Sequence, residues 1–193
     1  MSRAVLLIGE GQVEQARQAL EGILVHQPSY RPARDLLIRL EEKAGRTAAV
    51  RGHVFEILRQ SPDDPKANLQ LAAWQAEAGS FRLAEATLRA VLERNRSPVI
   101  LNNLAWAIRE QGRAAEALPY AEEAVRLAPD FASAHDTRAV VLADLGRTAE
   151  AVEAAAAAER CAPDNRAIRE RAARIRAGRP VPRAGDPAPP AAD

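Results

Sequence analysis

Apolar residues recur along the chain at the three- and four-residue spacing of α-helices that bury one face. Between residues 101 and 125 they form two sets, Leu101, Leu104, Ala105 and Ile108, then Ala117, Leu118, Ala121, Ala124 and Val125. Gly112 lies between the two sets, and glycine commonly follows the last residue of a helix. This stretch therefore predicts two antiparallel helices joined by a short turn.

The turn glycine returns at a nearly constant interval. Gly11, Gly45, Gly79, Gly112 and Gly146 are 34, 34, 33 and 34 residues apart. A small or β-branched residue follows each of them after five residues, at Ala16, Val50, Ala84, Ala117 and Ala151. Prolines occupy one phase of the period at Pro28, Pro62, Pro129 and Pro163, with Arg96 in the remaining position. Because proline cannot continue a helix, this pattern predicts a repeated helix pair.

A 34-residue period with two helices, a small eighth residue, a glycine near the fifteenth and a proline at the thirty-second resembles the tetratricopeptide repeat family. The resemblance implies an all-α fold, a right-handed α-solenoid of antiparallel helix pairs. The predicted segments are a truncated repeat 1–30, repeats 31–64, 65–97, 98–131 and 132–165, a capping helix 166–178 and a disordered, proline- and alanine-rich tail 179–193. Ala72, Ala105 and Ala139 supply the small eighth residue, whereas Ile38 replaces it in repeat 31–64.

The two ends of the array differ in their patterns. Ile168, Ala172 and Ile175 form one apolar stripe among arginines, which is typical of a helix that caps a repeat array. At the other end, the apolar residues 5–8 are only half covered by the helix predicted to follow them. We therefore expect self-association through this N-terminal edge.

Composition narrows the classes of function. The 193 residues are 47% hydrophobic and 27% charged, with a net charge of +1, so no overall field attracts nucleic acid. The N-terminus lacks the pattern of a secretory signal, and no apolar stretch reaches the length of a membrane span. The sequence predicts a cytoplasmic bacterial protein without membrane insertion, and Cys161, the single cysteine, excludes an intramolecular disulfide.

Motifs of enzymes are absent from the sequence. It contains no phosphate-binding glycine loop, no dinucleotide fingerprint, no serine nucleophile motif and no zinc-protease motif. His26, His53 and His135 fall in three different repeats, without the spacing of metal ligands. We expect no catalytic residue, cofactor or metal site, and the protein is predicted not to be an enzyme.

The family resemblance also implies where a partner binds, because the first helices of successive repeats line a concave groove. The predicted groove residues are Arg39, Lys43, Lys66, Gln70, Asn102, Asn103, Trp106, Arg109, Asp136 and Thr137. Trp106 could be a binding anchor or an inter-repeat packing residue, and the sequence leaves both open. Arg109, with the basic residues of earlier repeats, could receive acidic side chains, while Asp136 and Asp144 would favour a basic stretch. The residue set by which some family members clamp a terminal carboxylate is absent, with only Asn103 in agreement.

The resemblance points to a protein–protein interaction scaffold that binds a peptide or protein partner in the groove. The alternative is a regulatory or assembly segment of a larger protein of a bacterial envelope, exopolysaccharide or secretion system. An RNA-binding helical repeat is disfavoured, since no basic stripe with stacking aromatics accompanies the near-zero net charge.

Overall fold

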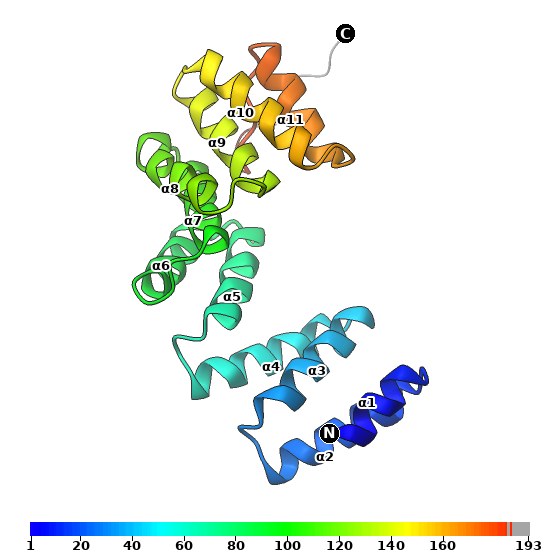
Figure 1. Cartoon of the computed structure of the whole chain (residues 1–193). Coiled ribbons are helices and arrows are strands. Elements are labelled where there is room, and N and C mark those ends of the chain that lie inside the picture. The colour runs from blue at the N-terminus through cyan, green and yellow to red at the C-terminus, as the bar shows by residue number, and fades with distance from the viewer. Residues whose placement is uncertain (185, 187–193) are drawn as a thin grey trace. The chain divides into compact units, whose positions relative to one another are not determined.

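The computed structural model describes residues 1–184 and 186, which contain eleven α-helices and no β-strand (Figure 1). The helices are α1 (Ser2–Gly9), α2 (Val13–His26), α3 (Arg31–Lys43), α4 (Thr47–Gln60), α5 (Pro65–Glu77), α6 (Phe81–Leu92), α7 (Pro98–Glu110), α8 (Ala114–Leu127), α9 (Ala132–Asp144), α10 (Thr148–Cys161) and α11 (Arg166–Arg176). The predicted all-α fold is confirmed. Among the described helices, none is long and apolar enough to cross a lipid bilayer.

The chain forms two compact bodies. The N-terminal body comprises Met1–Gln70, and the C-terminal body begins at Leu71, so the boundary falls inside α5. In the N-terminal body α1 packs on α2, α2 on α3 and α3 on α4. In the C-terminal body α6 packs on α7, α7 on α8, α8 on α9, α9 on α10 and α10 on α11. Within both bodies these helices thus pack on the next one in the sequence, as expected for a repeat array.

The turn between the helices of a pair has one recurring geometry. At the end of α3, Gly45 has φ +69°, its N–H donates to the carbonyl of Glu42 at 3.0 Å, and the N–H of Arg46 donates to the carbonyl of Glu41 at 2.9 Å. These two bonds define a Schellman motif, which satisfies carbonyls left free at a helix end. The other turn glycines, Gly11, Gly79, Gly112 and Gly146, also have a positive φ. The interval of the glycines therefore reflects a backbone conformation that other residues adopt only with strain.

The small residues predicted to pack between helices are buried. The residues five positions after the turn glycines, Ala16, Val50, Ala84, Ala117 and Ala151, are each at most 4% exposed. Ala72, Ala105 and Ala139 at the eighth positions of their repeats are buried as well. Alanine at these positions lets neighbouring helix axes approach closely.

The N-terminal edge is only partly covered. Ala4 and Leu7 of α1 join a core cluster with residues of α2 and α3, whereas Val5 and Leu6 remain 53% and 65% exposed. Helix α2 covers one face of α1, and the opposite apolar face stays open. Self-association through this edge stays a prediction.

Helix α11 covers the last helix pair of the C-terminal body. Its apolar stripe Ile168, Ala172 and Ile175 is buried, and the helix lies beside α10 (Figure 1). The N-cap is Asn165, whose side-chain oxygen accepts a hydrogen bond from the N–H of Ile168 at 3.2 Å. The exposed face of α11 carries the arginines that the sequence pattern placed there.

The segment after α11 differs from its prediction as a disordered tail 179–193. Residues 179–184, called here the C-terminal strap, turn back at Gly178 and contact α7 and α9, with Val181 only 6% exposed. The prediction is wrong for these residues, because their main-chain groups find partners on the helices. Residues 185 and 187–193, which complete the predicted tail, lie outside the described residues.

Candidate functional site

The predicted groove residues divide between the two bodies. Arg39, Lys43, Lys66 and Gln70 belong to the N-terminal body, and Asn102, Asn103, Trp106, Arg109, Asp136 and Thr137 belong to the C-terminal body. Within each body they lie on first helices of the helix pairs. The N-terminal group lies at an open cavity. In the C-terminal group, several side chains are engaged by other residues of the protein.

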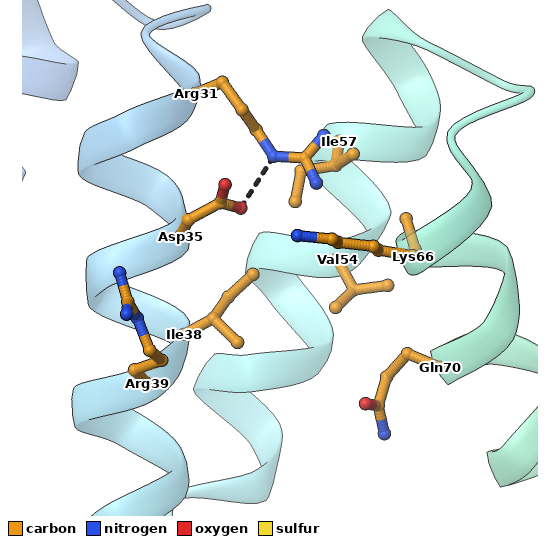
Figure 2. A pocket seen from close by; sticks show the side chains of 9 residues that line it. Arg31, Asp35, Ile38, Arg39, Val54, Ile57, Lys66 and Gln70 are labelled. Atoms are coloured by element: carbon orange, nitrogen blue, oxygen red, sulfur yellow. Dashed lines mark hydrogen bonds and ion pairs between the residues drawn. The ribbon is translucent and has the colours of Figure 1, made fainter. Parts of the chain in front are cut away.

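A cavity of about 320 Å³ opens in the N-terminal body between α3, α4 and the first turns of α5 (Figure 2). Its lining comprises Arg31, Asp35, Ile38, Arg39, Val54, Ile57, Lys66, Ala67 and Gln70. Three predicted groove residues, Arg39, Lys66 and Gln70, therefore converge on one cavity. Lys43 lies one helical turn beyond Arg39, is exposed and is not part of the lining.

Arg31 neutralises both carboxylates near the cavity. Its Nε donates to Asp35 Oδ1 at 2.6 Å, and its other nitrogens bond to Asp64. Burial alone would raise the pKa of Asp64, but the guanidinium of Arg31 and the N–H of Ala67 together lower it below its usual value. Asp64 Oδ1 accepts that N–H at 2.8 Å, so the carboxylate also caps the start of α5.

The remaining charges of the cavity are positive. Within the described part of the chain, the side chains of Arg39 and Lys66 form no ion pair, and both are exposed. Ile38, Val54 and Ile57 supply the apolar part of the lining, and Val54 and Ile57 are nearly fully buried. The cavity thus combines two available cations with an apolar floor. Ile38 occupies the eighth position of its repeat, where the other full repeats have alanine.

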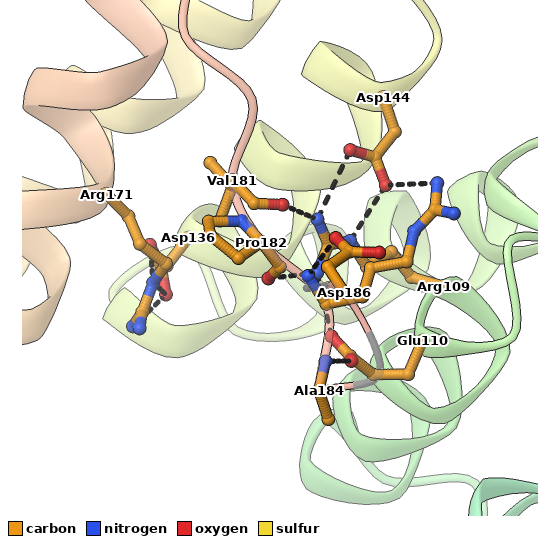
Figure 3. Close-up of polar contacts among 10 residues, drawn as sticks. Arg109, Glu110, Asp136, Asp144, Arg171, Val181, Pro182, Ala184 and Asp186 are labelled. Atoms are coloured by element: carbon orange, nitrogen blue, oxygen red, sulfur yellow. Dashed lines mark hydrogen bonds and ion pairs between the residues drawn. The ribbon is translucent and has the colours of Figure 1, made fainter. Parts of the chain in front are cut away.

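In the C-terminal body, Arg109 does not face a ligand, and its predicted role as a receiver of acidic side chains is wrong. Its side chain is fully buried. The guanidinium donates to Asp144 at 2.8 and 3.2 Å, to Glu110 at 2.7 Å and to two carbonyls of the C-terminal strap (Figure 3). All of its nitrogens are engaged, so no donor is left for a partner while the strap is in place.

Asp136 is also committed within the protein, and its predicted preference for a basic peptide stretch is wrong. Arg171 of α11 donates to both of its oxygens, at 3.0 and 2.8 Å from Nε (Figure 3). Burial raises the pKa of Asp136 above its usual value, against the lowering effect of Arg171. The pair joins α9 to the capping helix. Asp144 is likewise paired, with Arg109 and Arg183.

Trp106 is partly buried beside two guanidinium groups. The central carbon of Arg109 lies 5.5 Å from the ring centroid, and that of Arg171 lies 6.0 Å from it. These are cation–π distances, so the ring contributes to the packing of α7 and to the contact with α11. Its second possible role, as an anchor for a partner, stays a prediction.

The amides beside Trp106 are less available than the sequence indicated. Asn102 is 7% exposed and donates to Asn103 Oδ1 at 3.2 Å, and Thr137 is 3% exposed. The oxygen of Asn102 is buried without a hydrogen-bond partner among the described residues. Only Asn103 of these three is accessible to a partner.

No cluster of three or more histidine, cysteine, aspartate or glutamate side chains suited to a metal ion occurs within residues 1–184 and 186. Sequence reasoning missed two groups of residues. Arg31 was missed although the Arg31/Asp35 spacing of four residues on a helix indicates a pair. The strap was missed because its main-chain contacts leave no pattern in the sequence.

Comparison with known proteins identifies the repeat. The family model for the tetratricopeptide repeat matches residues 69–132 and 102–166, which together span just over half of the chain. The chain belongs to the tetratricopeptide repeat family. No curated protein matches the sequence.

Several solved tetratricopeptide repeat structures have a similar fold. The thermophilic protein TTC0263 of Thermus thermophilus is 20% identical, with a TM-score of 0.62, and the match covers 92% of this chain and 97% of that one. PilW, a type IV pilus biogenesis factor, is 14% identical with a TM-score of 0.70, covering 92% and 84%. YrrB, which has an unusual peptide-binding site, is 15% identical with a TM-score of 0.64, covering 83% and 84%. At these identities the similarity shows the fold alone.

The cavity of the N-terminal body and the strap of the C-terminal body lie on equivalent helices of their repeats. Helices α3, α5, α7 and α9 are the first helices of their pairs. The open cavity of the N-terminal body lies on α3 and α5, and the strap of the C-terminal body lies on α7 and α9.

Proposed function

We propose that this chain is a non-catalytic interaction module that binds a peptide or protein partner. The observation that carries the proposal is the cavity at which Arg39, Lys66 and Gln70 meet over an apolar floor. Peptide binding by a protein of the same fold, YrrB, agrees with this function.

The chemistry of the cavity favours an acidic partner segment that also carries an aliphatic side chain. Arg39 and Lys66 supply charge for a carboxylate, and the amide of Gln70 can bond to a peptide main chain. Lys43 follows Arg39 by four residues on the same helix face and extends the positive charge along α3. Ile38 and Val54 offer apolar contact to an aliphatic side chain.

The test compares partners recovered with the wild-type chain and with a charge-reversed cavity. The tagged protein is expressed in its native host, and co-purifying proteins are identified by mass spectrometry. The double variant Arg39→Glu/Lys66→Glu should lose the partner that the wild-type chain recovers, while circular dichroism shows unchanged helix content.

A matched control distinguishes an effect of the cavity residues on partner binding from an effect of the protein's net charge. Arg3→Glu/Arg82→Glu changes the charge by the same amount at two exposed sites that are not part of the cavity lining. This variant should retain the partner. Loss of the partner in both double variants, or recovery of it by both, contradicts the assigned cavity, and a chain that recovers no protein contradicts the interaction function.

A second proposal is that the chain is an assembly or regulatory segment of a larger bacterial envelope, exopolysaccharide or secretion protein. It is supported by the similar fold of PilW, which acts in type IV pilus biogenesis. Measurement of the intact mass of the native protein tests it, because a parent chain is heavier than the 20.9 kDa of this sequence. A native mass equal to that value contradicts this proposal and leaves the first untouched.

A further inference from the structure

The C-terminal strap crosses the ends of α7 and α9 in a non-helical conformation. A turn at Gly178, with φ +64°, reverses the chain after α11, and the N–H of Arg179 donates to the carbonyl of Arg174 at 2.9 Å. Beyond this turn, the strap passes Asp144 and reaches Glu110 (Figure 3). Four residues, 181–184, make its contacts with α7 and α9.

The helices bind the main chain of the strap. Arg109 donates to the carbonyl of Val181 and, at 3.2 Å, to that of Pro182. Glu110 Oε2 accepts the N–H of Ala184 at 2.7 Å. The donors of Arg109 and the acceptor of Glu110 therefore bind successive peptide groups of the strap. Such groups occur in any extended peptide.

Two side chains of the strap add selectivity. Val181 is 6% exposed and belongs to the core cluster formed with Ala139, Val140, Ala151 and Ile175 among others. Arg183 Nη2 lies 3.3 Å from Asp144 Oδ2. The site thus accepts a small aliphatic side chain and, two residues later, a basic one.

Charge balance explains why the site prefers a basic side chain at the position of Arg183. Glu110 and Asp144 bring two carboxylates to the site, and Arg109 brings one guanidinium. Arg183 supplies the missing positive charge. Without a basic residue from the bound segment, one buried or half-buried carboxylate would stay uncompensated, which is costly in a low-dielectric environment.

The strap is held like a bound peptide and not like a core element. Val181 is its only buried residue, whereas Pro180, Pro182 and Ala184 are exposed. A cavity of about 350 Å³ lies along it, lined by Val181, Arg183 and residues of α9, α10 and α11. Pro180 and Pro182 flank the valine, and proline favours an extended conformation with no N–H to satisfy. Exchange of the strap for another segment would uncover one buried side chain, that of Val181.

We propose that the surface formed by Arg109, Glu110 and Asp144 is a docking site for an extended partner peptide of the pattern small aliphatic, proline, basic. Residues 181–183, Val-Pro-Arg, occupy this site in cis, so that a partner binds by displacing the strap. This inference deepens the proposed function, on which it rests, by naming the chemistry of a peptide that the C-terminal body binds.

The experiment measures binding of a synthetic strap peptide to a full-length chain whose own strap is released. The variant Val181→Asp/Arg183→Glu removes both anchoring side chains without touching the helices. The probe is a fluorescein-labelled peptide, Arg-Pro-Val-Pro-Arg-Ala, followed by fluorescence anisotropy. The released variant should bind it at least about tenfold more tightly than the wild-type chain, whose strap competes from within the same molecule.

Two controls test specificity. A probe with aspartate in place of the valine and glutamate in place of the second arginine should not bind the released variant. A chain with Arg169→Glu, an exposed change on α11 away from the strap, should bind the probe as weakly as the wild type does. If the double variant unfolds, Arg183→Glu alone, which alters a partly exposed side chain, should still raise affinity above that of the wild type.

Three outcomes overturn the inference. A folded released variant that does not bind the probe at millimolar concentration shows that the surface is not a peptide site. Equal affinity of wild type and released variant shows that the strap does not occupy it. Dimers of the wild type that disappear on releasing the strap show that a second copy, not a partner peptide, is the occupant. Because the probe is synthetic, these results are independent of whether the Arg39/Lys66 cavity recovers a cellular partner.

Discussion

The guanidinium of Arg109 on α7 donates two hydrogen bonds to the carboxylate of Asp144 on α9, 35 residues further along the chain. Asp136 on α9 and Arg171 on α11 form a second pair at the same separation. The first pair joins the first helices of neighbouring repeats, and the second joins α9 to the capping helix α11. The charged residues of this surface therefore hold adjacent repeats together, and this function competes with their use for a ligand.

Removal of the Arg109 side chain should strongly destabilise the C-terminal body. In Arg109→Ala the carboxylates of Glu110 and Asp144 lose their buried partner, and we expect a cost of about 3–5 kcal/mol in the free energy of unfolding. Urea denaturation followed by circular dichroism measures it. The double variant Arg109→Met/Asp144→Leu should recover part of the loss, since an apolar pair needs no charge compensation. A single variant as stable as the wild type would contradict the structural role of Arg109.

Enlargement of Ala117 should overpack the junction between α8 and its neighbours. Ala117 is fully buried, and we expect Ala117→Leu to cost about 1–3 kcal/mol. Ala115 lies on the exposed face of the same helix and provides the matched control. Thermal unfolding should show a lower midpoint for the first variant and almost no change for Ala115→Leu. Equal midpoints for the two variants would rule out the assigned contact.

The turn glycines and the helix glycines should respond oppositely to alanine. Gly146 has φ +73°, so Gly146→Ala should destabilise by about 1 kcal/mol, although no atom would block the added Cβ. Gly22 lies within α2 without a positive φ and with open space around it, so Gly22→Ala should stabilise by about 0.5–1 kcal/mol. Chemical denaturation of both variants checks the signs, and a shared sign would argue against backbone conformation as the cause.

Features of the fold that depend on local backbone conformation or on the 34-residue period can be predicted from the sequence. Gly45 and its counterparts mark Schellman turns because only a positive φ reverses the chain there, and Ala117 and its counterparts are buried because one helix face repeats every 34 residues. The convergence of Arg39 and Lys66 on a cavity follows from the same helix faces. These features need no knowledge of contacts between particular side chains.

Features that depend on partners from other repeats could not be predicted in this way. The period places Arg109 and Asp136 on the face of the predicted groove, but it does not show that Asp144 and Arg171 lie within reach of them. The strap has the proline- and alanine-rich composition of a disordered tail. Its order comes from Arg109 and Glu110, which bind peptide groups common to every sequence.

Charge on the open face of α1 should reduce self-association. Leu6 is 65% exposed beside Val5, and a second copy would cover both. Leu6→Glu should therefore shift sedimentation velocity profiles at high protein concentration toward the monomer, with the helix content unchanged. Val25→Glu, at a 74% exposed position on α2, is the control for general solubility. A wild-type chain that is monomeric at every concentration would refute association through this edge.

The acid stability of the N-terminal body should depend on Asp64. The pKa of Asp64 is lowered in the folded protein, so its carboxylate contributes stability that is complete above the pKa of an unfolded aspartate and is lost as the pH falls through the lower, folded value. Asp64→Asn retains a capping side chain but gives weaker hydrogen bonds to Arg31, and we expect it to cost on the order of 1 kcal/mol at pH 7.

Below about pH 4 the carboxyl of the unfolded chain becomes protonated while that of the folded chain stays charged, so the difference in unfolding free energy between the two chains should begin to shrink, and it should approach zero once the pH falls below the lower pKa of the folded state. Urea denaturation at a series of pH values between about 7 and about 2 measures this difference, and Asp130→Asn, at an exposed position of another repeat, serves as the comparison. A difference between wild type and Asp64→Asn that stays constant over the whole range would mean that the charge of Asp64 does not stabilise the fold. In that case the capping hydrogen bond to Ala67, which asparagine also accepts, would be its whole contribution.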